Sequence, residues 1–582
     1  MTVTEPEIDG VPVLHAAAAG PVRAGLVFRA GQADETPAVA GVTHLIEHLV
    51  LRRAGGTCGG VSPVVTTFAA EGTAAEVIAH LERVCAALAA DPAPHLDAAR
   101  TELAAEAAQR TPTIFESLAV VRHGARHHGL AGLPEWGLPA LTAADVRRWI
   151  ATYFTRENAV LWTTGEVAGL RLPLPSGVRR PVPDAAAVPD RFGAFRPPPY
   201  DVIVRDELQP AGIVTEVYAG VLERVVFAAG TGAAGSGAAG ARVGAYRVKA
   251  HHRPRGDGLA SVTVLAEIFS GDPGPVAGDF LDALAALRAQ PVPNEHVAAA
   301  RQELDRALIA PDAAATRLPR RAFGLLTGVP EPSVEEARDR LRAVTAGQVG
   351  ELVAASRGPE LLLTSWNGLI GPAPAGPEPV AGRRFRSLES RRAALTMDRT
   401  GITRSWPDTR PVTVSFASTA VLLKWPDGGR RLIGADARHV DVEPTLHETT
   451  ADVIPAVDAA VPADRHVPLP PRAPDAIPVP RPRGKHPIRY GGAGALFLGL
   501  VAWVLAWAAL MLAITPGASS APVTLFGVFL IAWIWGGFRL RQVRNTTVAH
   551  RRLTRARKAA RREAVARGAV ARPVPAASPS RS

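Results

Sequence analysis

The sequence predicts an α+β protein made of several units. Its 582 residues are too many for one hydrophobic core. Short runs rich in Val and Thr alternate with amphipathic helical segments over residues 1–190, and this order is repeated over residues 200–370. We therefore expect two related α/β sandwich half-domains. A small β-rich module over residues 393–450 and two uncharged apolar runs near the C-terminus complete the predicted organisation.

The first half-domain is predicted to begin with two strands and to continue with a mixture of helices and strands. Thr73 and Glu76 have the spacing of a capping box, in which the hydroxyl and the carboxylate satisfy backbone N–H groups at the start of a helix. The expected strands are 11–14, 22–28 and 61–68, and the expected helices are 73–90 and 96–109.

The most informative motif is His44-Leu45-Ile46-Glu47-His48. On a helix, His44 and His48 lie four residues apart and face the same way, so both imidazoles can bind one Zn²⁺ ion. Glu47 lies beside the second histidine and can reach a water held by the metal, for which it would act as general base. This is the H-x-x-E-H order found in inverzincins. The alternative is a helix with two histidines that bind no metal.

A third zinc ligand should be a carboxylate from elsewhere in the fold. The predicted helix 96–109 has Glu102 and Glu106 on one face, four residues apart, and either could serve. The alternative is a solvated acidic face on an Ala-rich helix, which is common for such a pair.

Together these segments resemble the catalytic half-domain of the pitrilysin/insulinase family, which includes the mitochondrial processing peptidases. The loop Gly31 to Glu35 and the segment Gly41 to His48 are similar to the Gly-x-x-Asp-Glu loop and the motif of that family. Further matches are the Leu/Gly segment Gly129 to Pro134 and the segment from Tyr153 to Gly165. The resemblance implies metallopeptidase-type half-domains, a Zn²⁺ cofactor and peptide substrates.

The resemblance also implies roles for individual residues. His44, His48 and Glu102 would hold the zinc, with Glu106 as second choice, because the family spacing to the Phe115–Leu118 helix fits Glu102 better. One departure is the gap between His48 and Glu102, which is 102 − 48 = 54 residues, whereas the family has roughly seventy-odd. A helix after the metal motif is missing.

Residues 200–370 would form the metal-free partner half, with strands at 202–205 and 211–218 and helices at 279–289 and 294–309. Family members close their chamber with two such pairs, so a homodimer or a related partner subunit is implied. The module at 393–450 alternates in strand fashion and vaguely resembles pleckstrin-homology-like domains.

The remainder of the sequence predicts a membrane anchor. Residues 454–488 are predicted to form a Pro-rich linker, and 493–514 and 523–538 are predicted to form two transmembrane helices of 22 and 16 residues. Both flanks are basic, so the positive-inside rule places the bulk of the chain and the tail 539–582 in the cytoplasm of a plasma membrane. The net charge of +11 is concentrated in this tail, which favours contact with the lipid bilayer over nucleic acid.

Two functions remain open from the sequence. The first is a membrane-anchored zinc metallopeptidase in which Glu47 acts as general base. The second is a catalytically inactive family member that serves as an anchored peptide-binding or scaffold subunit, which the shortened gap favours. A third, an anchor protein binding lipid or nucleic acid, depends on the basic tail alone.

Overall fold

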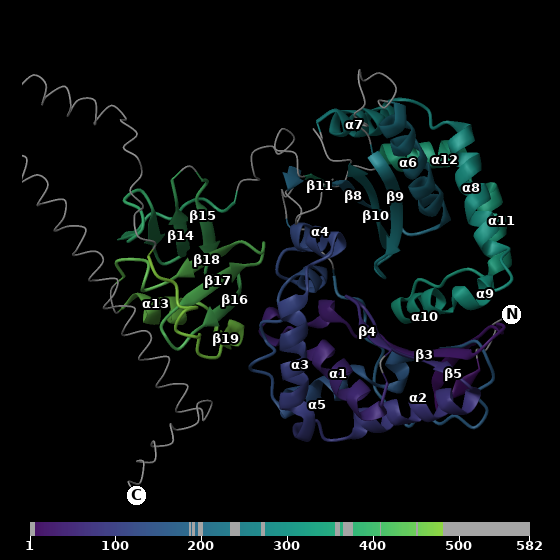
Figure 1. Cartoon of the computed structure of the whole chain (residues 1–582), viewed down its shortest axis with the longest axis horizontal. Helices are drawn as coiled ribbons and strands as arrows, with labels where there is room; N and C mark the ends of the chain where they lie inside the picture. The colour runs from purple at the N-terminus through teal and green to yellow at the C-terminus, as the bar shows by residue number, and fades with distance from the viewer. Residues whose placement is uncertain are drawn as a thin grey trace, which may run out of the picture.

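The computed structural model describes three bodies of secondary structure: an N-terminal half, a second half and a β-module (Figure 1). They are coloured from purple through teal to green. The described residues are 6–480, except 57, 185–187, 189–192, 196–201, 233–244, 269–273, 356–360, 365–375, 408, 450 and 451.

The predicted transmembrane helices 493–514 and 523–538 and the basic tail 539–582 lie outside the described residues. Among the helices that the structure does describe, none combines the length and the apolar character needed to span a bilayer.

The N-terminal half (residues 6–184) is a six-stranded sheet with order β1-β2-β6-β3-β5-β4, covered on one face by four of its own helices. All pairings are antiparallel except that of β2 with β6. The strands are β1 (Glu7–Ile8), β2 (Val11–His15), β3 (Val22–Phe28), β4 (Gly59–Val61), β5 (Thr66–Gly72) and β6 (Ala159–Thr163). The helices are α1 (Val42–Ala54), α2 (Ala74–Ala89), α3 (Leu96–Gln109), α4 (Ile114–His123) and α5 (Ala143–Tyr153).

The capping box of Thr73 and Glu76 and the helix predicted at 96–109 are confirmed. The single strand predicted at 61–68 is wrong, because this segment holds the turn between β4 and β5. The Ser62 hydroxyl caps that turn and hydrogen-bonds the backbone of Val65.

The second half (residues 193–364) has a five-stranded sheet with order β7-β11-β8-β10-β9. Its strands are β7 (Gly193–Phe195), β8 (Val202–Pro210), β9 (Ala245–Pro254), β10 (Leu259–Ile268) and β11 (Leu361–Thr364). Its helices are α6 (Ile213–Gly232), α7 (Gly274–Ala289), α8 (Asn294–Leu308), α9 (Ala313–Thr316), α10 (Leu318–Thr327), α11 (Val334–Ala343) and α12 (Ala346–Ala355).

The strand predicted at 211–218 is wrong, since these residues begin helix α6. Their β-branched side chains suggested a strand. However, Val214, Val217, Val221 and Val225 follow a helical spacing and pack on one face into the core of the second half.

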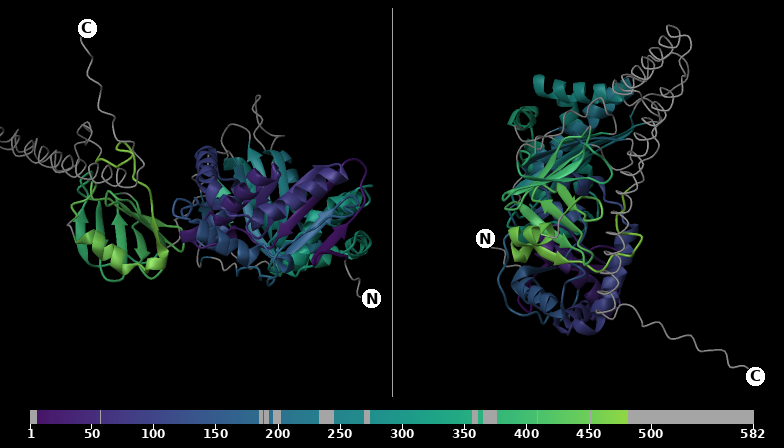
Figure 2. Two further views of the ribbon diagram at one scale, coloured as in Figure 1. Left: turned by 90° about the horizontal axis from the view of Figure 1, so that it is seen from below. Right: turned by 90° about the vertical axis from the view of Figure 1, so that its left-hand side faces the viewer.

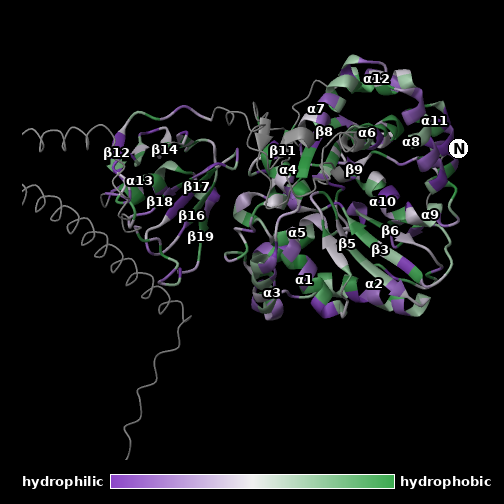
Figure 3. Cartoon of the chain, turned by 45° about the horizontal axis from the view of Figure 1, so that its top comes forward, coloured by the Kyte–Doolittle hydropathy of each residue, from purple (hydrophilic) through white to green (hydrophobic). Residues whose placement is uncertain are grey.

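Each half contributes a helix to the other half's sheet. Helix α10 packs through Leu318, Ala322 and Leu326 against the face of the first sheet that its own helices leave open. Helix α4 packs through Leu118 against Val204 and its neighbours on the second sheet. In Figure 3, hydrophobic residues lie along the central strands β3 and β8 of the two sheets. The halves are therefore joined by their cores as well as by their surfaces.

The β-module (residues 376–480) consists of two four-stranded sheets, with orders β12-β13-β14-β15 and β18-β17-β16-β19. Figure 2 shows it beside the two halves. The strands are β12 (Arg383–Arg386), β13 (Ala394–Met397), β14 (Gly401–Ser405), β15 (Val412–Ser415), β16 (Thr419–Lys424), β17 (Arg430–Gly434), β18 (His439–Val442) and β19 (His466–Pro468).

The Pro-rich linker predicted at 454–488 is wrong for its first part. Helix α13 (Val453–Ala460) packs Val453 and Val457 into the core of the module, and β19 closes its second sheet. Pro455 lies in the first turn of α13, where a missing N–H leaves no intrahelical bond unmade.

Candidate metal centre

The helix that carries the metal motif is held at its start by a buried carboxylate. Gly41 precedes α1 with a φ of 99°, a conformation that favours glycine. The Glu35 carboxylate accepts hydrogen bonds from the N–H groups of Gly41 at 2.8 Å and Thr43 at 2.9 Å, which have no partner within the helix. Burial raises the pKa of Glu35 to about 7, although both hydrogen bonds favour the charged form. The Gly31 to Glu35 loop thus fixes the position of α1.

His44 and His48 lie one turn apart on α1, with ring centroids 4.9 Å apart and about a fifth of each side chain exposed. The Nδ1 atom of His44 is 2.8 Å from Oε1 of Glu135. Burial opposes the charged form of His44, but this hydrogen bond and the nearby carboxylates of Glu135, Glu106 and Glu47 raise its pKa. The contact with Glu135 leaves Nε2 of His44 directed toward α3.

Helix α3 places Glu106, rather than Glu102, between the two imidazoles. Oε2 of Glu106 lies 3.4 Å from Nε2 of His48 and 3.8 Å from Nε2 of His44. Glu102 is ion-paired with Arg52, and its Oε2 lies 3.8 Å from Nδ1 of His48, on the opposite edge of that ring. The geometry therefore favours the second choice of the sequence analysis as the ligand.

The three side chains fit the requirements of zinc. His44, His48 and Glu106 each offer one ligand atom, and these atoms lie within 4.8 Å of one another. Metal–ligand bonds of about 2.1 Å in a tetrahedral site separate the ligand atoms by roughly 3.4 Å. The separation of Glu106 from Nε2 of His48 is already 3.4 Å, and a small rotamer change of Glu106, whose side chain is 49% exposed, would shorten its separation from Nε2 of His44. Within the described parts of the chain, no other group of three such residues comes together.

Glu47 lies under this cluster. Its side chain is 8% exposed, and Oε2 is 3.7 Å from Nε2 of His48. Burial raises its pKa, while the two histidines act in the opposite direction. Gly59 on the edge strand β4 lies against the Glu47 carboxylate and leaves no room there for a side chain. A carboxylate of the kind that can act as a general base thus lies beside the three candidate ligands.

Sequence reasoning missed Glu135, which lies 91 residues from His44 in the chain. No spacing rule connects the two residues, because Glu135 lies in the connection between α4 and α5 rather than in a helix or strand. The nearest sequence signal is the adjacent segment Gly129 to Pro134, which is one of the matches to the family.

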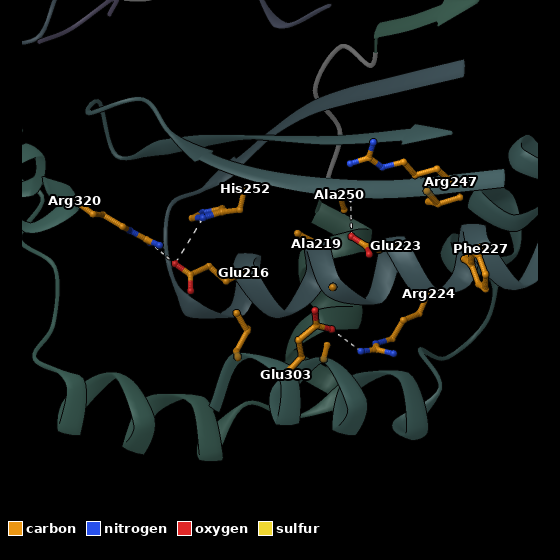
Figure 4. A pocket seen from close by; sticks show the side chains of 14 residues that line it. Glu216, Ala219, Glu223, Arg224, Phe227, Arg247, Ala250, His252, Glu303 and Arg320 are labelled. Atoms are coloured by element: carbon orange, nitrogen blue, oxygen red, sulfur yellow. Dashed lines mark hydrogen bonds and ion pairs between the residues drawn. The ribbon is translucent and has the colours of Figure 1, made fainter. Parts of the chain in front are cut away.

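The second half has a pocket of about 580 Å³ between α6, α8 and β9 (Figure 4). At one end, Glu216 is ion-paired with Arg320 and lies 3.6 Å from Nδ1 of His252. At the other end, Arg224 is paired with Glu303 at 2.6 Å. Burial and the charge of Arg320 lower the pKa of His252 to about 4. These charges balance one another and hold the elements of the second half together.

No protein-family model matches the sequence, and no curated protein matches it. Solved structures do match. A peptidase M16 inactive domain from Pseudomonas fluorescens superposes with a TM-score of 0.50 and 13% identity, over 62% of this chain and 97% of that one. This part of the chain has the peptidase M16 fold. At 13% identity the similarity establishes the fold of this part of the chain and not its activity.

Two further solved structures are similar to the M16-fold part. A chain of complex III2 from Candida albicans has a TM-score of 0.49 and 15% identity, over 62% of this chain and 95% of that one. A protease from Helicobacter pylori has a TM-score of 0.47 and 12% identity, over 61% of this chain and 97% of that one.

Proposed function

We propose that this protein is a membrane-anchored zinc metallopeptidase that hydrolyses peptides or unfolded segments. The observation that carries the proposal is the convergence of His44, His48 and Glu106 above the Glu47 carboxylate. Two imidazoles and one carboxylate, with a fourth position left for water, are the ligand set of catalytic zinc sites.

A Zn²⁺ ion in this site would polarise the peptide carbonyl and lower the pKa of water toward neutrality. His44, His48 and Glu106 would hold the ion, and Glu35 and Glu135 fix the helix and the ring that would present it. Glu47 takes the proton of the attacking water and passes it to the leaving amine. Its partial burial keeps bulk water away from that proton transfer.

The predicted transmembrane helices 493–514 and 523–538 would hold the peptidase at the cytoplasmic face of a plasma membrane. Because the described residues contain one pair of half-domains, we propose that the protein works as a homodimer or with a related partner subunit. A closed chamber formed by two such pairs of half-domains would exclude folded proteins and admit peptides.

The alternative is a catalytically inactive, anchored subunit that binds peptide. Two observations favour it: the short connection from α1 to β4, where Gly55 caps the helix and the strand begins at Gly59, and the similarity to an M16 domain described as inactive. The intact set of His44, Glu47 and His48 favours the peptidase.

The test uses the full-length protein in mild detergent. Its zinc content and its hydrolysis of a quenched peptide library are compared with those of Glu47→Gln. We expect about one zinc per chain in both proteins, and hydrolysis only in the wild type. Zinc without hydrolysis that depends on Glu47 would select the binding subunit, and absence of zinc from the wild type would contradict both the cofactor and the mechanism.

A further inference from the structure

The segment Leu133–Trp136, which contains Glu135, lies between helix α1 and the β-module. Glu135, whose side chain is 16% exposed, bonds to Nδ1 of His44, and its Cβ lies where any side chain at Gly41 would be. In metal sites, a carboxylate bonded to the far nitrogen of a ligating histidine fixes the orientation and basicity of the ring. Glu135 has this position toward His44.

The residues flanking Glu135 contact the β-module. Leu133 and Trp136 pack against a buried apolar cluster on the second sheet of the module, which we call the docking face. The docking face consists of Val421 and Leu423 of β16, Ile433 of β17 and Val467 of β19. Ala38, three residues before Gly41, packs on it as well. The module therefore contacts both the segment that orients His44 and the segment that leads into α1.

A backbone contact fixes the same interface. The N–H of Ala125 donates to the carbonyl of Ala435 at 3.0 Å, and Gly124, with a φ of 68°, leaves no room for a Cβ against that carbonyl. The docking face is thus closely fitted to the N-terminal half at the connection between α4 and α5.

We propose that the β-module is a structural part of the metal centre: its docking face holds the Leu133–Trp136 segment so that Glu135 orients His44, and the zinc affinity of the site depends on this docking. The inference deepens the proposed function and depends on it. Glu135 is a positioning residue, and a ligand or partner that displaced the module would weaken zinc binding.

The strands of the module provide a matched pair of variants. Neighbouring residues of a strand point to opposite faces. Leu423 is on the docking face, whereas Leu422 is in the module's own core, and both are almost fully buried. Leu423→Ala and Leu422→Ala therefore remove the same atoms from the same strand on opposite sides.

The experiment measures the zinc dissociation constant of the full-length protein in detergent by competition with a chromophoric chelator. Thermal unfolding shows that each variant is folded at the assay temperature. We expect Glu135→Ala to weaken zinc binding by about 10- to 100-fold, as loss of such a partner does. Glu135→Gln, which keeps a hydrogen-bonding group, should be intermediate. Leu423→Ala should give a smaller loss than Glu135→Ala, while Leu422→Ala keeps the wild-type affinity.

Unchanged zinc affinity in Glu135→Ala, or equal affinities in the Leu423→Ala and Leu422→Ala proteins, would overturn the inference. Failure of the wild-type protein to bind zinc would instead overturn the proposed function. Zinc binding by the wild-type protein is therefore the measurement that distinguishes the two failures. Because Glu135→Gln changes only one side-chain group at a largely buried position, it tests the role of Glu135 even if a module variant does not fold.

Discussion

Arg122 and Asp206 join the two halves through a buried ion pair. Nη2 of Arg122 lies 2.6 Å from Oδ2 of Asp206, and both side chains are less than 5% exposed. Arg122 is at the end of α4 in the N-terminal half, and Asp206 is on β8 of the second half. The second Asp206 oxygen accepts hydrogen bonds from Ser261 and Thr263, so this carboxylate is fully engaged.

The first prediction concerns this pair. Arg122→Met leaves the Asp206 charge buried without its cation, which costs about 3–5 kcal/mol. Urea unfolding of the variant should therefore begin at a clearly lower concentration than for the wild type. Arg147→Met is the control, because Arg147 and its partner Asp91 are each more than half exposed. Equal unfolding curves for Arg122→Met and Arg147→Met would contradict the prediction.

The second prediction separates the two candidate glutamates on α3. Glu106→Gln should lose most of its bound zinc, since Glu106 faces both Nε2 atoms. Glu102→Gln should retain it, because Glu102 faces Arg52 and the other edge of the His48 ring. The measurement is metal content after dialysis against a weak chelator. Loss of zinc from Glu102→Gln with retention in Glu106→Gln would restore the first choice of the sequence analysis.

The third prediction uses neighbouring glycines of β4. A Cβ at Gly59 would collide with the Glu47 carboxylate and lie 2.9 Å from Cδ1 of Leu51, whereas a Cβ at Gly60 meets nothing within 4 Å. We expect Gly59→Ala to lower peptide hydrolysis at least tenfold, as displacement of a general base does. Its zinc content should be close to that of the wild type. Gly60→Ala should resemble the wild type in both measurements.

The fourth prediction is a pH dependence of stability. His252 has a pKa of about 4 in the folded protein, and an unfolded histidine has about 6.5. Between these values the unfolded state binds more protons, so stability falls as the pH is lowered from 6.5 to 4. This difference between the two pKa values corresponds to roughly 3 kcal/mol.

His252→Leu removes this contribution and should flatten the loss of stability in acid. Denaturant unfolding at pH 7 and pH 4.5 measures it. At pH 7 the two proteins should differ much less, because neither ring nitrogen of His252 has a hydrogen-bond partner in the described structure that leucine would remove. A wild type and variant with the same acid dependence would contradict this assignment.

Local patterns predicted the helix that carries His44 and His48, but they could not choose between the two glutamates of α3. His44 and His48 must share a face because a helix repeats every 3.6 residues. Glu102 and Glu106 also share a face, and they differ by four residues, or about 6 Å along the axis. The position of α3 along α1 decides between them, and the buried side chains of Leu96, Ala99 and Leu103 set it.

Other misses have the same origin in tertiary contacts. The β-branched residues that begin α6 form a helix because their spacing fits the core of the second half. Pro455 is accommodated in the first turn of α13 because Val453 and Val457 are buried in the β-module. Glu135 and His44 are far apart in the sequence, so only the folded structure shows their contact. Sequence periodicity contains none of these long-range contacts.

The close fit of Gly124 to Ala435 has a practical consequence for protein engineering. A chimaera in which the β-module is replaced by a homologous one must keep glycine at position 124. The replacement module must also follow the same backbone path at the position of Ala435. If the replacement module follows a different path at that carbonyl, the segment that contains Gly124 should be exchanged together with the module.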